Sequence, residues 1–475
     1  MDEQIREVPQ TPIRRRRKPR SKMQIFKESY LPVIIAGASL LLIIIFVIGS
    51  ISRAVAKNKA DRAESIKQSQ EAANAEQMLK DEAQRLLDEA AYLAAGYDFE
   101  GAIATLNSFQ GDIAKFPELA NKRAEYEQSK SQMTVYNDIS AIPNLSFQLL
   151  IADPERAFSD AEFSSAYKNN FITVSEFKNI LQALYNNNYM LVNLQDLVTT
   201  TVAEDGSTVF TAKPLYLPAD KKPFMLTETQ VNYYTYMVDS DSDGLADKDG
   251  AGFASKLVVD AQGKLVNEYI DTDGNVLYGA YDMVPILEEF IAQHPDFSLR
   301  GARATVAVTG YDRLFGYRTT PAAAQELGTE AYQTEIDGVL DVVDALQANG
   351  YSIACYTYEN ISYGDASATE IQADLKKWNE QVTPILGNTA ILVYARNSDI
   401  ADTASYSGDR YQVLKDAGFR YFLGYSSSAA PWATVENDYV RIKRIMITGT
   451  DLVNNPQIYS AYFNASEVLD AARNG

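Results

Sequence analysis

Histidine and cysteine are almost absent from the chain. Among 475 residues there is one histidine, His294, and one cysteine, Cys355. A single cysteine excludes an intramolecular disulfide, so the fold must be stable through its core alone. Cys355 lies inside an apolar run, which predicts a buried, unreactive thiol. His294 follows an amphipathic stretch and precedes a proline, which predicts a capping or solvent-exposed position.

Positive charge is scarce outside the first residues. The formal net charge is −20, and residues 1–22 contain eight Lys/Arg and three Asp/Glu, a net of +5 that leaves −25 for the rest. An acidic body argues against binding through general electrostatics to anionic polymers, so we expect no nucleic-acid partner. The hydrophobic share of 46%, with 30 Tyr and 19 Phe, indicates an extensive packed core.

The N-terminal region combines a basic stretch with a long uncharged one. Residues 31–51 contain no charged side chain and follow the basic stretch 14–22. A helix of this length spans about 30 Å, the thickness of a bilayer core. We therefore expect a basic cytoplasmic tail at 1–30, an uncleaved transmembrane helix at 31–51 and an extracellular C-terminal part, which is a single-pass protein of the cell membrane. A cleaved signal peptide is the alternative.

The next segment, residues 52–140, is rich in Ala, Glu, Lys and Gln, which favours helix. We expect an α-helical stalk that ends near Gly96. Residues 90–109 then resemble one helix-turn-helix of a tetratricopeptide repeat (TPR-like), although stacked arrays need about three units. This region is interpreted either as a spacer or as a surface that docks a partner protein.

From about residue 141 to 475, short apolar runs alternate with helical patterns, and this alternation predicts an α/β fold with a parallel sheet closed as a (β/α) barrel. Turn signals at 260–263 and 271–274 predict a β-hairpin insertion at about 237–280. The candidate strands are residues 145–151, 190–193, 224–227, 304–309, 352–355, 390–394, 421–423 and 440–447.

Three segments resemble the polysaccharide deacetylases of carbohydrate esterase family 4. They are GYDRLFGYRT at 310–319, IACYTYEN at 353–360 and LKDAGFRYFLGY at 414–425, within a similar order of strands over about 144–465. The resemblance implies a distorted (β/α)7-type barrel that removes N-acetyl groups from cell-envelope or related polysaccharide. It also implies a divalent metal held by one Asp and two His, with a second Asp as the base and a later His as the acid. The metal polarises the acetamide and activates a water.

The sequence departs from this pattern at each motif. By position, Thr229 replaces the base and Gln230 replaces the metal-binding Asp. Tyr356 and Asn360 replace the two histidines, and Ala395 replaces the proline of a later motif. These neutral groups are poor ligands for zinc-like ions. The site is therefore interpreted as a pseudoenzyme site with no cofactor for catalysis.

Two further sets of residues are candidates for binding. Aromatic faces flanked by arginine are a common lining for sugar rings, although tyrosines at strand ends also simply pack the barrel. The glycan-binding candidates are Tyr233, Tyr234, Arg318, Tyr358, Tyr394 and Arg396. Separately, acidic residues within 239–250 match the start of a calcium loop, with a solvated hairpin tip as the alternative. The calcium candidates are Asp239, Asp241, Asp243 and Asp247.

Three functions remain open from the sequence. The first is a membrane-anchored pseudoenzyme that binds cell-envelope polysaccharide or an envelope protein. The second is an active N-deacetylase with an atypical site that uses Glu228, Glu359 or Asp399. The third is a structural protein whose helices dock partners. Active sites of such barrels lie at the carboxyl ends of the strands, whereas His294 follows a helix. We therefore expect His294 to lie at the opposite end and to take no part in these sites.

Overall fold

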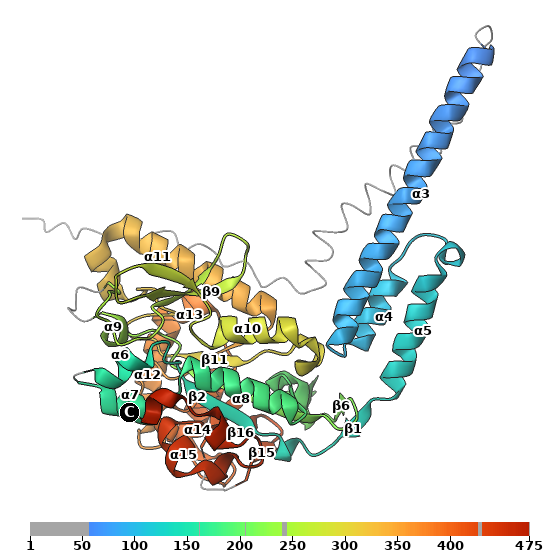
Figure 1. The fold of residues 1–475 in the computed structure, drawn as a ribbon. Coiled ribbons are helices and arrows are strands. Elements are labelled where there is room, and N and C mark those ends of the chain that lie inside the picture. Colours follow the sequence, from blue (N-terminus) through green and yellow to red (C-terminus); the bar gives the residue numbers. More distant parts are fainter. Residues whose placement is uncertain (1–56, 161, 205, 240–244, 426–429, 475) are drawn as a thin grey trace, which may run out of the picture.

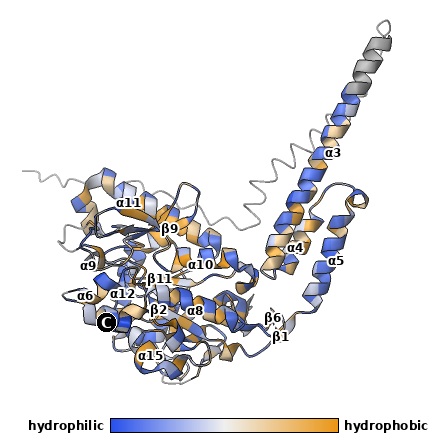
Figure 2. Ribbon diagram, in the orientation of Figure 1, coloured by the Kyte–Doolittle hydropathy of each residue, from blue (hydrophilic) through white to orange (hydrophobic). Residues whose placement is uncertain are grey.

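The computed structural model describes residues 57–160, 162–204, 206–239, 245–425 and 430–474, and it has a helical arm followed by a barrel (Figure 1). The arm consists of α3 (Lys57–Ala95), α4 (Phe99–Asn107) and α5 (Pro117–Ser131). Asp98 begins α4, because its carboxylate accepts a hydrogen bond from the Gly101 N–H at 3.0 Å. Figure 2 shows hydrophilic residues along the free length of α3 and hydrophobic residues where it meets α4. The expected helical stalk is present, and its TPR-like character stays a prediction.

The barrel is a closed ring of seven parallel strands that follow one another in chain order. Each strand pairs with the next, and the last strand pairs with the first. The ring consists of β2 (Asn144–Gln148), β7 (Lys222–Thr229), β11 (Thr305–Val308), β12 (Ser352–Cys355), β13 (Ile391–Val393), β14 (Tyr421–Gly424) and β16 (Val440–Met446). The predicted seven-stranded barrel is confirmed. All seven strands were expected as apolar runs, because parallel strands covered by helices are hydrophobic on both faces.

Helices cover the outside of the ring, and the longest, α11, ends in a left-handed glycine. Gly350 has φ +96°, and its N–H bonds the Gln347 carbonyl, so the chain can turn directly into β12. The helices are α6 (Pro154–Ser159), α7 (Ser164–Asn170), α8 (Val174–Asn186), α9 (Thr235–Val238), α10 (Met283–Gln293), α11 (Pro321–Asn349), α12 (Ala368–Gln381), α13 (Thr383–Leu386), α14 (Gly408–Asp416), α15 (Gly449–Asn454) and α16 (Ala465–Val468).

The insertion between β7 and β11 is a three-stranded antiparallel sheet. It contains β8 (Lys256–Val259), β9 (Leu265–Ile270) and β10 (Val276–Gly279), joined by turns at 260–263 and 271–274. Both predicted turns are confirmed, and the expected hairpin gains a third strand. The small strands elsewhere are β1 (Thr134–Tyr136) with β6 (Leu215–Leu217), β4 (Val198–Val202) with β5 (Thr208–Ala212), β3 (Tyr189–Leu191) beside β7, and β15 (Ala433–Val435) beside β16.

Alternation along the strands separates two hydrophobic layers. Met225, Ala307 and Val393 belong to the cluster inside the ring. Leu226 and Val306, one position along their strands, belong to the cluster between the ring and the helices. This period of two decides which side chains face the interior of the barrel. Cys355 falls in the outer layer and is fully buried, as expected, and burial raises the pKa of its thiol.

The membrane part of the fold prediction is corrected by the structure. Within the described ranges given above, no helix combines the length and the apolar composition needed to cross a bilayer. The segment 31–51, for which a transmembrane helix was predicted, lies outside the described residues, as does the tail at 1–30. The fold is therefore described as a helical arm and a seven-stranded barrel, and the predicted cell-membrane location is not carried further.

Candidate site at the carboxyl end of the barrel

The carboxyl ends of β2 and β7 bring two glutamines together. Gln230 donates from Nε2 to Oε1 of Gln148 at 3.2 Å, and both side chains are partly exposed. Thr229 is fully buried, and its hydroxyl donates to the Phe147 carbonyl at 3.2 Å. The positions where the resemblance requires two carboxylates therefore carry an amide and a hydroxyl that is already bonded to the backbone.

The segment after β12, which holds Tyr356 and Asn360, is fixed by one buried carboxylate. Asp374, on α12, accepts hydrogen bonds from the Tyr358 N–H at 2.7 Å and the Glu359 N–H at 2.8 Å. It also accepts one from the Tyr363 hydroxyl at 2.7 Å. These bonds hold a tight turn that directs Tyr356 into the barrel. Asn360 lies at the carboxyl end of the ring, beside the loops after β7, β11, β12 and β13, and this end is called the mouth. The Oδ1 atom of Asn360 is buried and has no hydrogen-bond partner among the described residues.

Left-handed backbone is concentrated in the loops at this end of the barrel. Eight of the twelve described non-glycine residues with positive φ lie in the loops after β7, β11, β12 and β13. Such conformations cost about 1–3 kcal/mol each and cluster at functional sites. The eight residues are Gln230, Tyr233, Asp312, Phe315, Thr357, Asn360, Arg396 and Asn397.

The central cation of the mouth, Arg444, was not predicted from the sequence. Its side chain points into the barrel from β16 and is 1% exposed. Nη1 donates to the Ser146 hydroxyl at 3.3 Å, and Nη2 donates to the Tyr394 carbonyl at 2.8 Å and to Oδ1 of Asn397 at 3.1 Å. The guanidinium lies 6.0 Å from the ring centre of Tyr356. One signal could have found it: three basic residues in the buried strand VRIKRIM.

The other two predicted positions complete this network. Ala395 is fully buried in the inner layer. Arg396, the next residue, is exposed at the mouth, and its N–H donates to the Tyr356 hydroxyl at 3.3 Å. Its Nε donates to the Asn360 carbonyl at 2.9 Å. The structure thus joins β12, β13 and β16 through Tyr356, Arg396 and Arg444.

This set of residues does not fit a divalent metal. The groups at the expected ligand positions, Gln230, Tyr356 and Asn360, are all neutral. No cluster of three or more His, Cys, Asp or Glu side chains within the described part of the chain is arranged to hold a metal ion. The guanidinium of Arg444 also adds a fixed positive charge beside Tyr356, which disfavours a second cation there.

The three carboxylates considered for an atypical enzyme lie in three different surroundings. Glu359 forms a surface ion pair with Lys377. Asp399 is buried against Arg441, with the two side chains 2.9 Å apart. Glu228 is fully buried in the outer layer. The alternating strand turns it away from the mouth, whereas its neighbour Thr227 bonds Asn144 inside the ring at 2.9 Å.

Glu228 forms a buried acidic pair with Asp282 at the beginning of α10. Asp282 accepts hydrogen bonds from the Leu150 N–H at 2.9 Å and the Tyr233 hydroxyl at 2.7 Å, which favour its ionised form. Neither oxygen of Glu228 has such a donor among the described residues. Burial, together with the neighbouring Asp282, raises the pKa of Glu228 well above its usual value. Glu228 therefore holds the proton of the pair and is a structural group.

Most of the predicted glycan-binding tyrosines are buried. Tyr233, Tyr234 and Tyr394 are at most 1% exposed, so their rings offer no face to a ligand in this structure. Tyr358 is 7% exposed, and its hydroxyl donates to Gln381 at 2.7 Å. Arg318 forms an ion pair with Glu326. Of the six candidates, Arg396 is the one that lies exposed at the mouth.

A short tyrosine stack lies beside the mouth, and of its members Tyr234 was a candidate from the sequence whereas Tyr236 was missed. The ring of Tyr234 stacks on Tyr311 at 5.2 Å and on Tyr236 at 5.7 Å between centroids. Tyr236 is 47% exposed and Tyr311 is partly exposed. The buried Tyr234 thus supports two accessible rings. The closely spaced tyrosines of VNYYTYM were the available signal.

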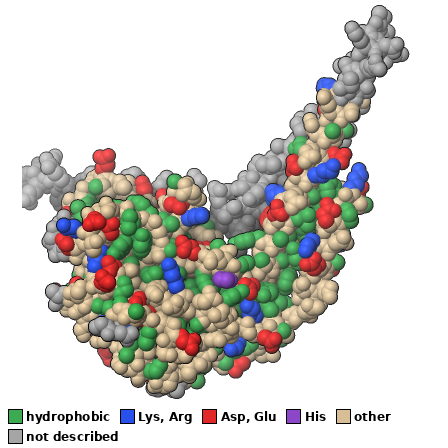
Figure 3. Space-filling view, in the orientation of Figure 1, with side chains coloured by type: hydrophobic (Ala, Val, Ile, Leu, Met, Phe, Trp, Pro, Cys, Tyr) green, Lys and Arg blue, Asp and Glu red, His purple; other side chains and the backbone are tan. Residues whose placement is uncertain are grey.

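The remaining predicted residues lie away from the mouth or outside the described part of the chain. His294 ends α10, and its ring packs 4.4 Å from Tyr185, a capping position as expected. Figure 3 shows it on the outer surface, between scattered acidic and basic side chains. Asp239 is buried, whereas Asp241 and Asp243 lie outside the described residues. Calcium binding by these residues and Asp247 stays a prediction.

Comparisons with known proteins give a weak structural likeness and no family match. No protein-family model matches the chain, and no curated protein matches it. The chain is similar to a solved structure described as Streptococcus pyogenes deacetylase PplD in complex with acetate, at 15% sequence identity and a TM-score of 0.32. The match covers 65% of this chain and 92% of that one. A likeness of this size assigns no function to this chain.

Proposed function

We propose that the barrel is a non-catalytic module that binds polysaccharide. The observation that carries this proposal is the composition of the mouth, which has Gln148, Gln230 and Asn360 at its rim and Tyr356 beside the buried Arg444. Hydrolysis of an acetamide needs a base for the attacking water and a group that stabilises the developing charge. Amides are not bases at neutral pH, and an arginine stays protonated. The mouth lacks the first of these groups.

The same residues are suited to binding sugars. Side-chain amides donate and accept hydrogen bonds, as sugar hydroxyls do. Tyr311 and Tyr236 add partly exposed aromatic faces beside the mouth. Flat apolar faces combined with a few fixed polar groups are a common composition for ligand sites. The hydrogen bonds from Asp374 to the loop after β12 support this interpretation, because a loop that is already held in place loses little entropy on binding.

The proposal is tested by measuring metal content, deacetylation and binding on the same purified full-length chain. After incubation with zinc and gel filtration, we expect far less than one zinc per chain and no release of acetate from N-acetylated peptidoglycan or chitin oligosaccharides. We also expect retention on immobilised polysaccharide that falls in an Arg396→Ala variant and not in Arg123→Ala, an exposed arginine of α5. Stoichiometric zinc, or acetate release, would overturn the proposal.

A further inference from the structure

Arg444 differs in its partners from Arg441 and Arg473, two other buried arginines of the barrel. Arg441 pairs with Asp399, and Arg473 pairs with Glu176. Arg444 forms no ion pair within the described residues, and its contacts are to a hydroxyl, a carbonyl, an amide and a thioether. Its Nε is buried without a hydrogen-bond partner among those residues. A buried charge without a counter-charge costs several kcal/mol.

The environment of Arg444 confirms that this charge is poorly compensated. Burial lowers the pKa of its guanidinium, and Tyr356 only partly opposes this effect. The group nevertheless stays protonated, because the ordinary pKa of arginine lies far above neutral pH. Asp399, the acid whose charge favours the protonated form of Arg444, is already bound by Arg441 and by the Tyr406 hydroxyl at 2.8 Å. The protein thus maintains an unpaired positive charge beneath the mouth of the barrel.

We propose that the mouth binds the carboxylate of an acidic sugar, with Arg444 as the buried counter-charge and Arg396 as an exposed one. This inference rests on the proposed polysaccharide-binding function and names the class of its ligand. The exposed Asn397 is the group that a ligand would replace, since its Oδ1 accepts from Nη2 of Arg444 at 3.1 Å. A carboxylate oxygen in that position replaces a neutral acceptor and turns the hydrogen bond into an ion pair.

The chemistry of the mouth favours a carboxylate on a neutral ring over other anions. The planar guanidinium matches a carboxylate in two parallel hydrogen bonds. The neutral amides of Gln148, Gln230 and Asn360 suit the hydroxyls of the same sugar. The formal charge of the chain, −20, disfavours groups that carry more than one negative charge, such as a phosphate, because the further charge is repelled. A sugar with one carboxylate per ring satisfies these conditions.

Calorimetry with defined oligosaccharides tests the inference. The probes are a galacturonate hexamer, its fully methyl-esterified counterpart and a chitin hexamer, each titrated into the full-length chain. We expect the acid to bind at least tenfold more tightly than its ester. Free galacturonic acid and acetate serve as additional arms, and they distinguish recognition of a carboxylate within a polysaccharide from recognition of a small carboxylate alone.

The variant that tests the role of Arg444 most directly is Asn397→Asp. It places a carboxylate on the guanidinium without changing side-chain shape, and aspartate tolerates the left-handed backbone as asparagine does. We expect it to abolish the preference for the acid and to raise the melting temperature. Asn107→Asp is the matched control, because Asn107 on α4 also accepts from an arginine, Arg123, at 3.1 Å but is exposed and far from the mouth.

Each outcome decides the inference. If the ester binds as tightly as the acid, or if Asn397→Asp keeps the preference, the inference is overturned while polysaccharide binding stands. If no oligosaccharide binds, both proposals fail. Arg444→Lys should weaken acid binding and Arg444→Met should remove it. If Arg444→Met does not fold, Asn397→Asp and Arg396→Gln decide alone, and Arg396→Gln should reduce the preference for the acid several-fold.

Discussion

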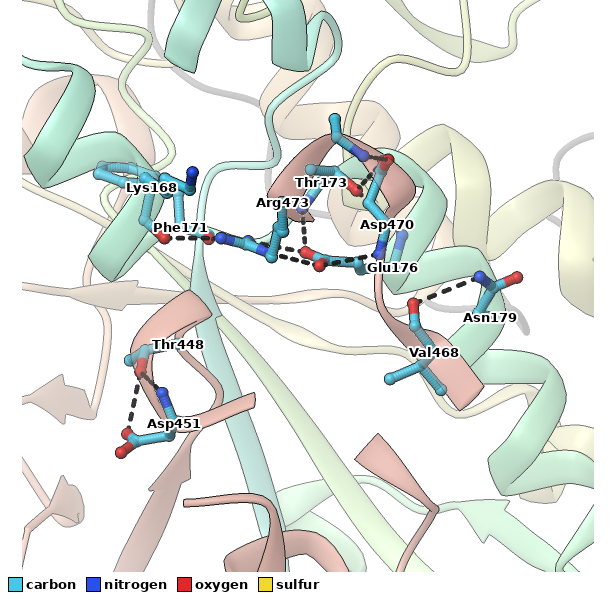
Figure 4. A network of polar contacts seen from close by, with 11 residues as sticks. Lys168, Phe171, Thr173, Glu176, Asn179, Thr448, Asp451, Val468, Asp470 and Arg473 are labelled. Carbon is cyan, nitrogen blue, oxygen red and sulfur yellow. Dashed lines mark hydrogen bonds and ion pairs between the residues drawn. The ribbon is translucent and has the colours of Figure 1, made fainter. Parts of the chain in front are cut away.

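A buried ion pair between Arg473 and Glu176 joins the last described residues to the barrel. Removing one partner of this pair should strongly destabilise the fold. Arg473 forks around the carboxylate of Glu176, which is 0% exposed, and its Nη2 donates to the second oxygen at 2.8 Å (Figure 4). The same guanidinium donates to the Lys168 and Phe171 carbonyls at 2.6 Å each. Glu176 also closes the capping box of α8 with Thr173.

The loss of unfolding free energy can be worked out from the contacts that remain to Glu176 in an Arg473→Met variant. Glu176 would keep two N–H donors, those of Thr173 at 2.9 Å and Asp470 at 3.2 Å, but would lose its buried counter-charge. Breaking a buried pair from one side costs about 3–5 kcal/mol. The two carbonyls that lose their donor place this case near the upper end. At about 2 °C per kcal/mol for a large domain, the melting temperature should fall by about 8–10 °C.

Differential scanning calorimetry, with the fluorescence of Trp378 and Trp432 as a second probe, measures this shift. Glu176→Gln combined with Arg473→Met should recover part of the loss, because the orphaned charge disappears with its partner. Arg123→Met is the control. Its pair with Glu127 is exposed and 3.9 Å long, so its melting temperature should stay within error of wild type. A double variant as unstable as Arg473→Met, or a control equally destabilised, would refute the reasoning.

Three further predictions concern single groups. Glu228 binds its proton more tightly in the folded chain than in the unfolded one, so stability falls as pH rises above about 4.5. Glu228→Gln should therefore melt above wild type at pH 8 and at the same temperature at pH 4, and an equal difference at both pH values would contradict the assignment. Asp374→Asn should lower the free energy of unfolding, measured by urea titration, by about 2 kcal/mol, because the turn after β12 loses charge-assisted hydrogen bonds. The same variant should be retained less on immobilised polysaccharide. Gly350→Ala should lower the free energy of unfolding by about 1–2 kcal/mol, because a side chain is strained at φ +96°. An unchanged urea midpoint would show that this position does not require glycine.

The barrel could be predicted from the sequence because its signals are local. Each strand is a short apolar run, and helical patterns separate each strand from the next except between β14 and β16. The separate antiparallel pair formed by β4 and β5 was not predicted. Residues 199–202 of β4 are exposed and threonine-rich, so they carry no alternation between apolar and polar positions. Membership in a small, solvent-exposed sheet depends on pairing with a distant segment, which a local pattern does not report.

The site was predicted in part, for a different reason. Thr229, Gln230, Tyr356 and Asn360 were found because a motif fixes their spacing, and the structure places all four at the carboxyl end of the ring. Arg444 was missed because its importance arises only when the ring closes and β16 lies beside β2. The buried tyrosines were misjudged because a residue near a strand end lies inside or outside depending on one step of register.

The neutral motif positions and the buried arginine are electrostatically connected. An aspartate at position 397 would neutralise the guanidinium of Arg444, and a metal ion bound at the mouth would be repelled by it. With Asn397 and Tyr356 beside it, the charge of Arg444 is neither paired nor opposed. Restoring a carboxylate at the mouth should therefore not restore metal binding while Arg444 is present. Gln230→Asp combined with Tyr356→His and Asn360→His should bind zinc only when Arg444→Met is added. Zinc binding by the triple variant alone would show that Arg444 does not control the charge of the mouth.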